Sequence, residues 1–128
     1  LVDERGELAA VCDGEPQMDI GVCCDVLDGY RKDEGIMTAI RTLSPELIIC
    51  DEIGGEGEAQ AVSAAMNAGV RLITTAHAGS IAELLARPQI RRLTATGAFG
   101  TAVILGCGRE TGRIKCKAGL DVLREARP

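Results

Sequence analysis

A short apolar run that ends in two acids constrains the fold of this chain more than any other feature. Leu47-Ile48-Ile49-Cys50 is continuous and hydrophobic, and Asp51 and Glu52 follow it directly. Such a run is expected for a strand of a parallel sheet that is buried on both faces. The two carboxylates would then stand at the carboxyl end of that strand, where parallel sheets bind their ligands.

Helical and extended patterns alternate on both sides of this strand. We expect strands at 1–11, 47–50 and 70–76, helices at 32–43, 58–68, 81–86 and 88–93, and a terminal hairpin of 101–105 with 113–117. Residues 19–27 are predicted as a short strand or an ordered loop, and 120–128 as weakly helical or frayed. Ser80 and Glu83 have the spacing of a capping box. The alternation predicts an α/β fold with a mostly parallel sheet flanked by helices.

The length of 128 residues suits a single domain, 1–128. Hydrophobic residues make up 46% of the chain and aromatic residues only 2%, so Ala, Val, Ile and Leu must build the core. No apolar run is long enough to cross a bilayer, and no leader pattern opens the chain. We expect a soluble, unexported protein that is truncated at its N-terminus, because Leu1 lies inside a predicted strand. The scarcity of aromatic residues and the net charge of -5 argue against nucleic-acid binding.

Charge and cysteines are distributed unevenly. Residues 1–86 carry 5 basic and 16 acidic side chains, whereas residues 87–128 carry 9 and 3. This division would suit head-to-tail docking of copies or an acidic partner, and equally a solvated surface of uneven charge. The six cysteines form no C-x-x-C pair, which favours reduced, mostly buried thiols. Cys107 and Cys116 would face each other if a hairpin is centred between them, which makes them a candidate pair.

Polar residues follow three of the predicted strands: Asp3 and Glu4, Asp51 and Glu52, and Thr74, Thr75 and His77. Because carboxyl ends of parallel strands share one edge of the sheet, we expect a common site there. The segment 47–52 has the form of a Walker B strand. In that role Asp51 holds Mg²⁺ through its water shell, and Glu52 orients and deprotonates the attacking water. Acids that only cap the following helix would look the same.

Several strings, taken in order, resemble the stage III sporulation protein AA family. They are Val2-Asp3-Glu4-Arg5, Asp25-Val26-Leu27-Asp28, Arg41-Thr42-Leu43-Ser44-Pro45-Glu46, Asp51-Glu52-Ile53-Gly54, Asn67-Ala68-Gly69-Val70 and Thr75-Ala76-His77. The resemblance runs from residue 1 to about residue 105. Motifs in the right order across one domain are more specific than any of them alone.

The resemblance implies a RecA-like P-loop ATPase, similar to the hexameric ATPases of type II and type IV secretion. It places Glu4 in an acidic box that activates water or organises magnesium, with Asp3 beside it. It places Thr75 and His77 in a histidine box, where His77 contacts the γ-phosphate. The implied cofactors are ATP and Mg²⁺ in an intact parent. The implied partners are further copies in a homo-hexamer and membrane-embedded sporulation channel proteins, with the parent in the mother-cell cytoplasm at the membrane periphery.

The chain departs from the family pattern at three places. No G-x-x-x-x-G-K-[ST] occurs, and none of the lysines, Lys32, Lys115 and Lys117, lies in a glycine-rich turn. The missing Walker A strand is expected before residue 1 and between the strands that end near residues 76 and 105, so the 128 residues alone should not bind ATP. Gly55 stands where the family commonly has arginine, and Cys23-Cys24 where it has arginine-threonine. Arginines at 87, 91 and 92 would supply ring contacts or form a solvated helix face.

Two other classes of function compete with this hypothesis. A receiver-like signalling domain would also place Asp3, Glu4, Asp51 and a threonine in one acidic pocket. It would require a helix after the first strand, where Gly14 and Pro16 stand, and a late lysine that the chain lacks. A non-catalytic structural remnant is the third possibility. For His77 an ordinary hydrogen-bonded histidine, and for Glu4 a surface ion pair, are the simpler interpretations.

Overall fold

The computed structural model describes residues 1–120. The chain divides into two compact units, Leu1–Ala76 and His77–Pro128, and each is described by itself. The predicted weak helix after residue 120 lies outside the described residues. The interpretation of 1–128 as one domain therefore stays a prediction.

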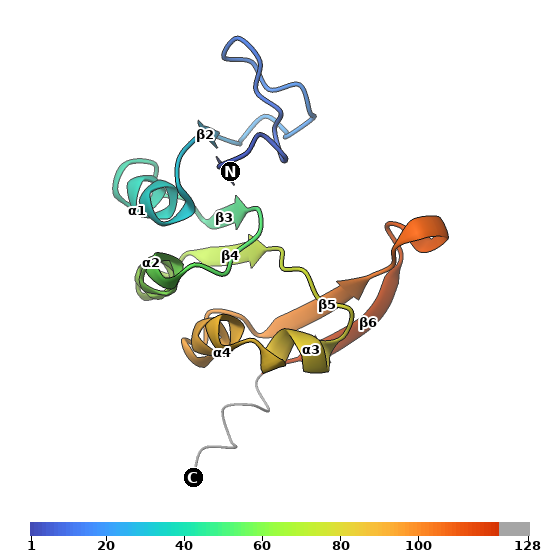
Figure 1. Ribbon diagram of the computed structural model, residues 1–128. Coiled ribbons are helices and arrows are strands. Elements are labelled where there is room, and N and C mark those ends of the chain that lie inside the picture. The colour runs from blue at the N-terminus through green and yellow to red at the C-terminus, as the bar shows by residue number, and fades with distance from the viewer. Residues whose placement is uncertain (121–128) are drawn as a thin grey trace. The chain divides into compact units, whose positions relative to one another are not determined.

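The first unit is a four-stranded parallel sheet with the order β2-β1-β3-β4 (Figure 1). Its strands are β1 (Val2–Asp3), β2 (Leu27–Asp28), β3 (Leu47–Cys50) and β4 (Arg71–Thr74). Cys50 is level with Val2 on one side and with Thr74 on the other. The strands therefore end together at one edge, as the sequence predicted.

Two helices cover one face of this sheet, α1 (Lys32–Thr42) and α2 (Glu56–Asn67) (Figure 1). The α1 residues Ile36 and Ala39 and the α2 residues Ala61 and Ala65 form one buried cluster with β1 and β3. Gly35 lets α1 approach β1 closely, since a Cβ at this position would overlap the side chain of Val2. Small residues thus take the place of aromatic ones in setting the distance between helix and sheet.

The prediction that β3 is buried on both faces is wrong. Ile48 and Cys50 point to the helices and are 2% and 1% exposed, whereas Leu47 is 39% exposed. Successive residues of a strand point to opposite faces, and α1 and α2 both pack on the face of Ile48. On β4, Ile73 is 53% exposed. An apolar run shows that a strand is hydrophobic, but it does not show which face of the sheet is covered by helices of the same unit.

The predicted first strand is much shorter than expected. Only Val2–Asp3 is extended, and the chain then turns at Gly6 and Ala10, which have φ values of 69° and 49°. The Asp3 carboxylate accepts hydrogen bonds from the backbone of the following residues, which holds the turn in place of a strand partner. Within the segment 19–27, which was predicted as a short strand or an ordered loop, residues 19–26 form loop and turn and Leu27 begins β2, so each alternative holds for part of the segment.

The helix and strand boundaries elsewhere agree with the prediction to within two residues. Helix α1 ends one residue early, at Thr42, and β4 ends at Thr74. Helix α2 begins at Glu56, two residues early, because the Glu58 carboxylate accepts hydrogen bonds from the backbone N–H groups of Gly54 and Gly55 at 2.5 and 2.7 Å. These bonds satisfy donors at the start of the helix.

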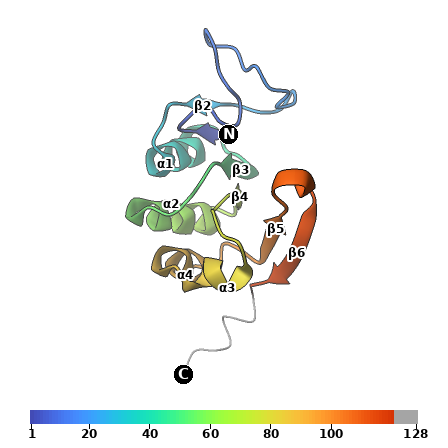
Figure 2. The same ribbon diagram turned by 45° about the vertical axis from the view of Figure 1, so that its right-hand side comes forward.

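The second unit contains α3 (Ile81–Ala86), α4 (Pro88–Ala95), the strands β5 (Thr101–Leu105) and β6 (Ile114–Gly119), and the 3₁₀ turn η1 (Gly108–Glu110) (Figure 2). The strands β5 and β6 form the predicted antiparallel hairpin. The Ser80 hydroxyl accepts a hydrogen bond from the Glu83 N–H at 3.1 Å, and the Glu83 carboxylate accepts one from the Gly79 N–H at 2.7 Å. The predicted Ser80 N-cap is confirmed, but Glu83 bonds to the N–H of Gly79 and not to that of Ser80, as a capping box would require.

The prediction of mostly buried thiols is wrong, although all six cysteines are free. Cys50 alone is buried, Cys24 is half-buried, and the other four are exposed. The candidate pair does not form, because the hairpin register sets Cys116 opposite Ile104, while Cys107 lies beyond the end of β5.

Candidate functional site

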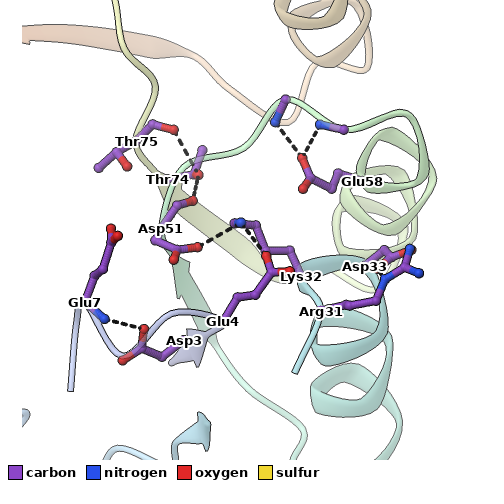
Figure 3. A network of polar contacts seen from close by, with 12 residues as sticks. Asp3, Glu4, Glu7, Arg31, Lys32, Asp33, Asp51, Glu58, Thr74 and Thr75 are labelled. Atoms are coloured by element: carbon purple, nitrogen blue, oxygen red, sulfur yellow. Dashed lines mark hydrogen bonds and ion pairs between the residues drawn. The ribbon is translucent and has the colours of Figure 1, made fainter. Parts of the chain in front are cut away.

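The carboxyl ends of β1, β3 and β4 form the candidate site (Figure 3). Glu4 follows β1, Asp51 follows β3, and Thr74 ends β4. The Thr74 hydroxyl donates a hydrogen bond to the backbone carbonyl of Asp51 at 2.9 Å. The Thr75 carbonyl accepts one from the Ile53 N–H at 3.0 Å. The loop that carries Asp51 and Glu52 is therefore tied to the neighbouring strand.

Asp3 lies inside the protein, with no exposed surface. Its carboxylate accepts hydrogen bonds from the N–H groups of Glu7, Leu8 and Ala9 at 2.9, 3.1 and 2.8 Å. Burial raises the pKa of Asp3, but these backbone N–H groups lower it by more, so the net shift is downward. In this structure the Asp3 carboxylate stabilises the turn that follows β1. The predicted contact of Asp3 with a cofactor stays a prediction.

Lys32, the first residue of α1, lies between two of the predicted site carboxylates (Figure 3). Its Nζ is 2.6 Å from Glu4 Oε2 and 3.2 Å from Asp51 Oδ1. The Lys32 side chain is 6% exposed, that of Asp51 4%, and that of Glu4 34%. We call these three residues the Lys32 triad.

The two ion pairs of the triad differ in kind. The contact with Glu4 is a short hydrogen bond of 2.6 Å, whereas the contact with Asp51 is a longer ion pair, with Nζ 3.2 Å from Oδ1. Burial lowers the pKa of Lys32, but the hydrogen-bonding contacts with Glu4 and Asp51 and the charges of these two carboxylates raise it by more. The ammonium therefore stays charged at neutral pH.

Sequence reasoning missed Lys32 as a site residue. It noted only that the lysine lies outside a glycine-rich turn. A signal was present, since a cation in the first turn of a helix opposes the helix dipole and calls for nearby anions. The choice of Glu4 and Asp51 as those anions depends on the sheet, which brings together residues 47 positions apart.

The remaining predicted residues lie at the same edge or in the second unit. Glu52 follows Asp51 and is half-buried, and Thr75 is exposed just past β4. His77 is exposed and begins the second unit. The structure thus brings Glu4, Asp51 and Lys32 into contact, and the assignments of the other residues stay predictions.

The carboxylate oxygens of Glu4 and Asp51 at this edge already face a cation, the Lys32 ammonium. Asp51 presents two buried carboxylate oxygens without hydrogen-bond partners in residues 1–120, and hard oxygen ligands are what Mg²⁺ prefers. No cluster of three or more His, Cys, Asp or Glu side chains with metal-binding geometry occurs among the described residues. The 128 residues contain no G-x-x-x-x-G-K-[ST] loop that would cradle a nucleotide phosphate, and the glycine-rich segment 54–57 carries no lysine.

Within residues 1–120, no helix has both the length and the apolar character needed to cross a membrane.

A family model and one curated relative name the same family for this chain. The family model "Sporulation stage III, protein AA" matches residues 1–120. Stage III sporulation protein AA of Bacillus subtilis (strain 168) is 41% identical over 114 residues, which cover 89% of this chain and 37% of that protein. The uncharacterized protein ycf45 of Cyanidium caldarium is 40% identical over 60 residues, which cover 47% of this chain and 18% of that protein.

No solved structure matches this chain. The aligned part is little more than a third of the Bacillus relative, so the activity of a whole protein does not transfer with the match. The family model covers all of the described residues, and the identity extends through both units. The chain therefore belongs to the stage III sporulation protein AA family.

Proposed function

We propose that this chain is the Walker B part of an ATP-hydrolysing, RecA-like ATPase of the secretion type that acts in sporulation. The observation that supports the proposal most is the position of Asp51. Its carboxylate is buried at the carboxyl end of a parallel strand, without hydrogen-bond partners in residues 1–120, and Glu52 follows it. A buried carboxylate is costly, and this one is compensated by the Lys32 ammonium, 3.2 Å from Asp51 Oδ1. Sites that bind cations are where such costs are tolerated.

The residues have separate roles in this proposal. Asp51 holds the position of Mg²⁺ through the water shell of the ion, and the ion supplies charge neutralisation for the phosphates. Glu52 orients a water and accepts its proton. Glu4 lies on the neighbouring strand end and assists either step. Thr75 and His77 would contact the nucleotide from the segment that follows β4.

The wider biological role follows from the family. We propose that the parent assembles as a homo-hexamer and works with membrane-embedded sporulation channel proteins, in the mother-cell cytoplasm and peripheral to the membrane. The segregation of charge along the sequence would suit contacts between copies. Residues 1–128 contain no phosphate-binding loop, so on their own they should not bind ATP.

A matched pair of variants tests the assignment of Glu52. In a longer protein that carries these residues together with a Walker A loop, Glu52→Gln should lower ATP turnover by roughly 100-fold or more, since general-base catalysis contributes about that much. Glu46→Gln makes the same chemical change at an exposed position before β3 and should leave turnover unchanged. Equal turnover in the two variants would remove Glu52 from the mechanism.

Two further measurements address the rest of the proposal. The coding sequence upstream of Leu1 should encode a glycine-rich loop with a lysine, and its absence would reduce the family member to a degenerate ATPase. Purified residues 1–128 should show no ATP binding above background in equilibrium titration. Micromolar or tighter binding would require a phosphate cradle that the sequence does not contain.

The receiver-like alternative has one observation in its favour and two against it. The strand order β2-β1-β3-β4 is also how receiver domains begin. However, no helix joins β1 to β2, and Asp51 is only 3% exposed, which leaves little access for a phosphodonor. Labelling of Asp51 by acetyl phosphate would favour this alternative over the ATPase.

A further inference from the structure

The lysine of the Lys32 triad lies in a position that is unusual for this residue type, because it is buried and at the N-terminal end of a helix. Lysine is almost never fully buried unless it is paired, and Lys32 also stands at the helix end where a positive charge is least favoured. The position is tolerated because Glu4 and Asp51 surround the ammonium (Figure 3). The cation in this site is thus part of the protein itself.

The charges of the triad do not cancel. One ammonium faces two carboxylates, which leaves a net charge of about −1 when all three groups are ionised. The Lys32 ammonium lies nearer to Glu4 than to Asp51, and both Asp51 oxygens lack hydrogen-bond partners in the described part of the chain. The buried carboxylate is therefore the less satisfied of the two, and a second positive charge would be stabilised beside it.

We propose that Lys32 is a resident counter-ion that occupies the cation position between Glu4 and Asp51 and leaves it when a divalent cation binds there. The inference rests on the proposed function, which makes Asp51 a cation-binding residue. The flexible four-carbon stem of lysine allows the ammonium to move without displacement of α1. Lys32 is then a positioning residue that keeps two site carboxylates compensated when no divalent cation is bound.

The displacement has a consequence for Glu4. While the ammonium donates to Glu4 Oε2 at 2.6 Å, that oxygen is engaged by the lysine and is not available to water or to another cation. Departure of Lys32 frees the carboxylate for work on water or on the hydration shell of the cation. Binding of the cation and release of Glu4 would be one event.

Amine labelling of the wild-type chain tests the displacement directly. The chain has three lysines, and Lys115 and Lys117 are exposed on β6 and serve as internal references. An acetylating reagent with a mass-spectrometric readout for each lysine should label Lys32 slowly without metal. Addition of millimolar Mg²⁺ or Mn²⁺ should raise labelling of Lys32 at least fivefold relative to Lys115. Unchanged or slower labelling of Lys32 in the presence of metal would overturn the inference.

A pair of variants tests the competition from the side of the metal. Lys32→Gln removes the counter-ion, whereas Arg31→Gln removes the same charge from the adjacent, exposed position. Binding of Mn²⁺ alone, followed by electron paramagnetic resonance, should be at least tenfold tighter in Lys32→Gln than in wild type. Arg31→Gln should stay within about twofold of wild type. Equal affinities in the two variants would show that Lys32 does not occupy the cation position.

These experiments separate the inference from the proposed function, because neither contains nucleotide. Should Lys32→Gln not fold, the labelling of wild-type protein still decides the question. Failure of the longer protein to hydrolyse ATP, together with metal-dependent exposure of Lys32, would refute the ATPase and leave the cation exchange standing. Turnover with a lysine that stays protected would do the reverse.

Discussion

Gly35 offers a sharp test of how this unit positions its site. The residue lies inside α1, three positions after Lys32, and faces β1, from which Glu4 follows. A Cβ at this position would overlap Val2 Cγ1, and it would also lie 3.2 Å from Tyr30 Cβ and 3.4 Å from Val2 Cγ2. The substitution Gly35→Ala therefore pushes apart the two elements that hold the Lys32 triad.

Two opposing effects set the magnitude. Replacement of glycine by alanine within a helix ordinarily stabilises by about 1 kcal/mol. Overpacking of a closed core costs about 1–3 kcal/mol, and Val2 is 1% exposed and has both γ-carbons in the way, so the upper part of that range applies. We expect Gly35→Ala to lower the free energy of unfolding by about 1–2 kcal/mol.

A double-mutant cycle with Val2→Ala isolates the overlap. Val2→Ala alone removes buried methyl groups and should cost roughly 1–3 kcal/mol. In the double variant the new Cβ of residue 35 occupies space that the valine methyl groups have left. The double variant should therefore be more stable than the sum of the two single effects predicts, by at least about 1 kcal/mol.

Urea unfolding followed by tyrosine fluorescence is a suitable assay, because Tyr30 is the only tyrosine, lies beside Gly35, and no tryptophan is present. Gly57→Ala is the matched control. A Cβ there would lie 2.8 Å from Asp33 Oδ2, the end of a side chain that can turn away. The helical preference of alanine should therefore dominate at this position in α2, and Gly57→Ala should raise the free energy of unfolding by up to about 1 kcal/mol. Wild-type stability of Gly35→Ala, or strict additivity with Val2→Ala, would refute the argument.

Three further predictions concern single groups. Asp3→Asn should lower the free energy of unfolding at pH 7 by roughly 1–3 kcal/mol, since a charged acceptor of three backbone N–H groups is lost. The folded pKa of Asp3 lies below its ordinary value of 3.8, so the stabilisation by its carboxylate is present above pH 3.8 and is lost as the pH falls toward the lowered pKa. Urea titrations of wild type and Asp3→Asn should therefore give free energies of unfolding that converge in this acid range. A difference between the two proteins that does not change with pH would contradict the prediction. Ser80→Ala should destabilise α3 by about 0.5–2 kcal/mol, measured by amide hydrogen exchange of residues 81–86, and unchanged protection would show that the cap is dispensable. Burial raises the pKa of the Cys50 thiol. A disulfide reagent near pH 8 should therefore modify the exposed cysteines first, and Cys50 only at the rate at which the protein unfolds. Rapid modification of Cys50 in the folded protein would contradict its position in the core.

Local features of the chain were predictable because they depend on neighbouring residues. The apolar run before Asp51 predicts β3, and the spacing of Ile36, Met37 and Ile40 predicts α1. The cap at Ser80 and the terminal hairpin are of the same kind. Boundaries moved by a residue or two where a side chain reached beyond its own element, as Glu58 does at the start of α2.

The candidate site was predicted in part. The rule that parallel strands end at one edge was enough to bring Glu4 and Asp51 together. It did not reveal the Lys32 ammonium between them, because that contact requires the first residue of α1 to lie beside the carboxyl ends of β1 and β3. It also did not assign the Asp3 carboxylate to the turn after β1, which took the place of the long strand that was predicted.

What the sequence by itself determined is the order and type of the elements and the presence of acids after two of the strands. Hydrophobic period, capping residues and breakers act over a few positions, so they can be read without a structure. What only the tertiary structure decided is which face of β3 is covered, how closely α1 approaches β1 at Gly35, and which carboxylates pair with Lys32. These depend on contacts between residues tens of positions apart, whose energies are set by distance and burial in the folded chain.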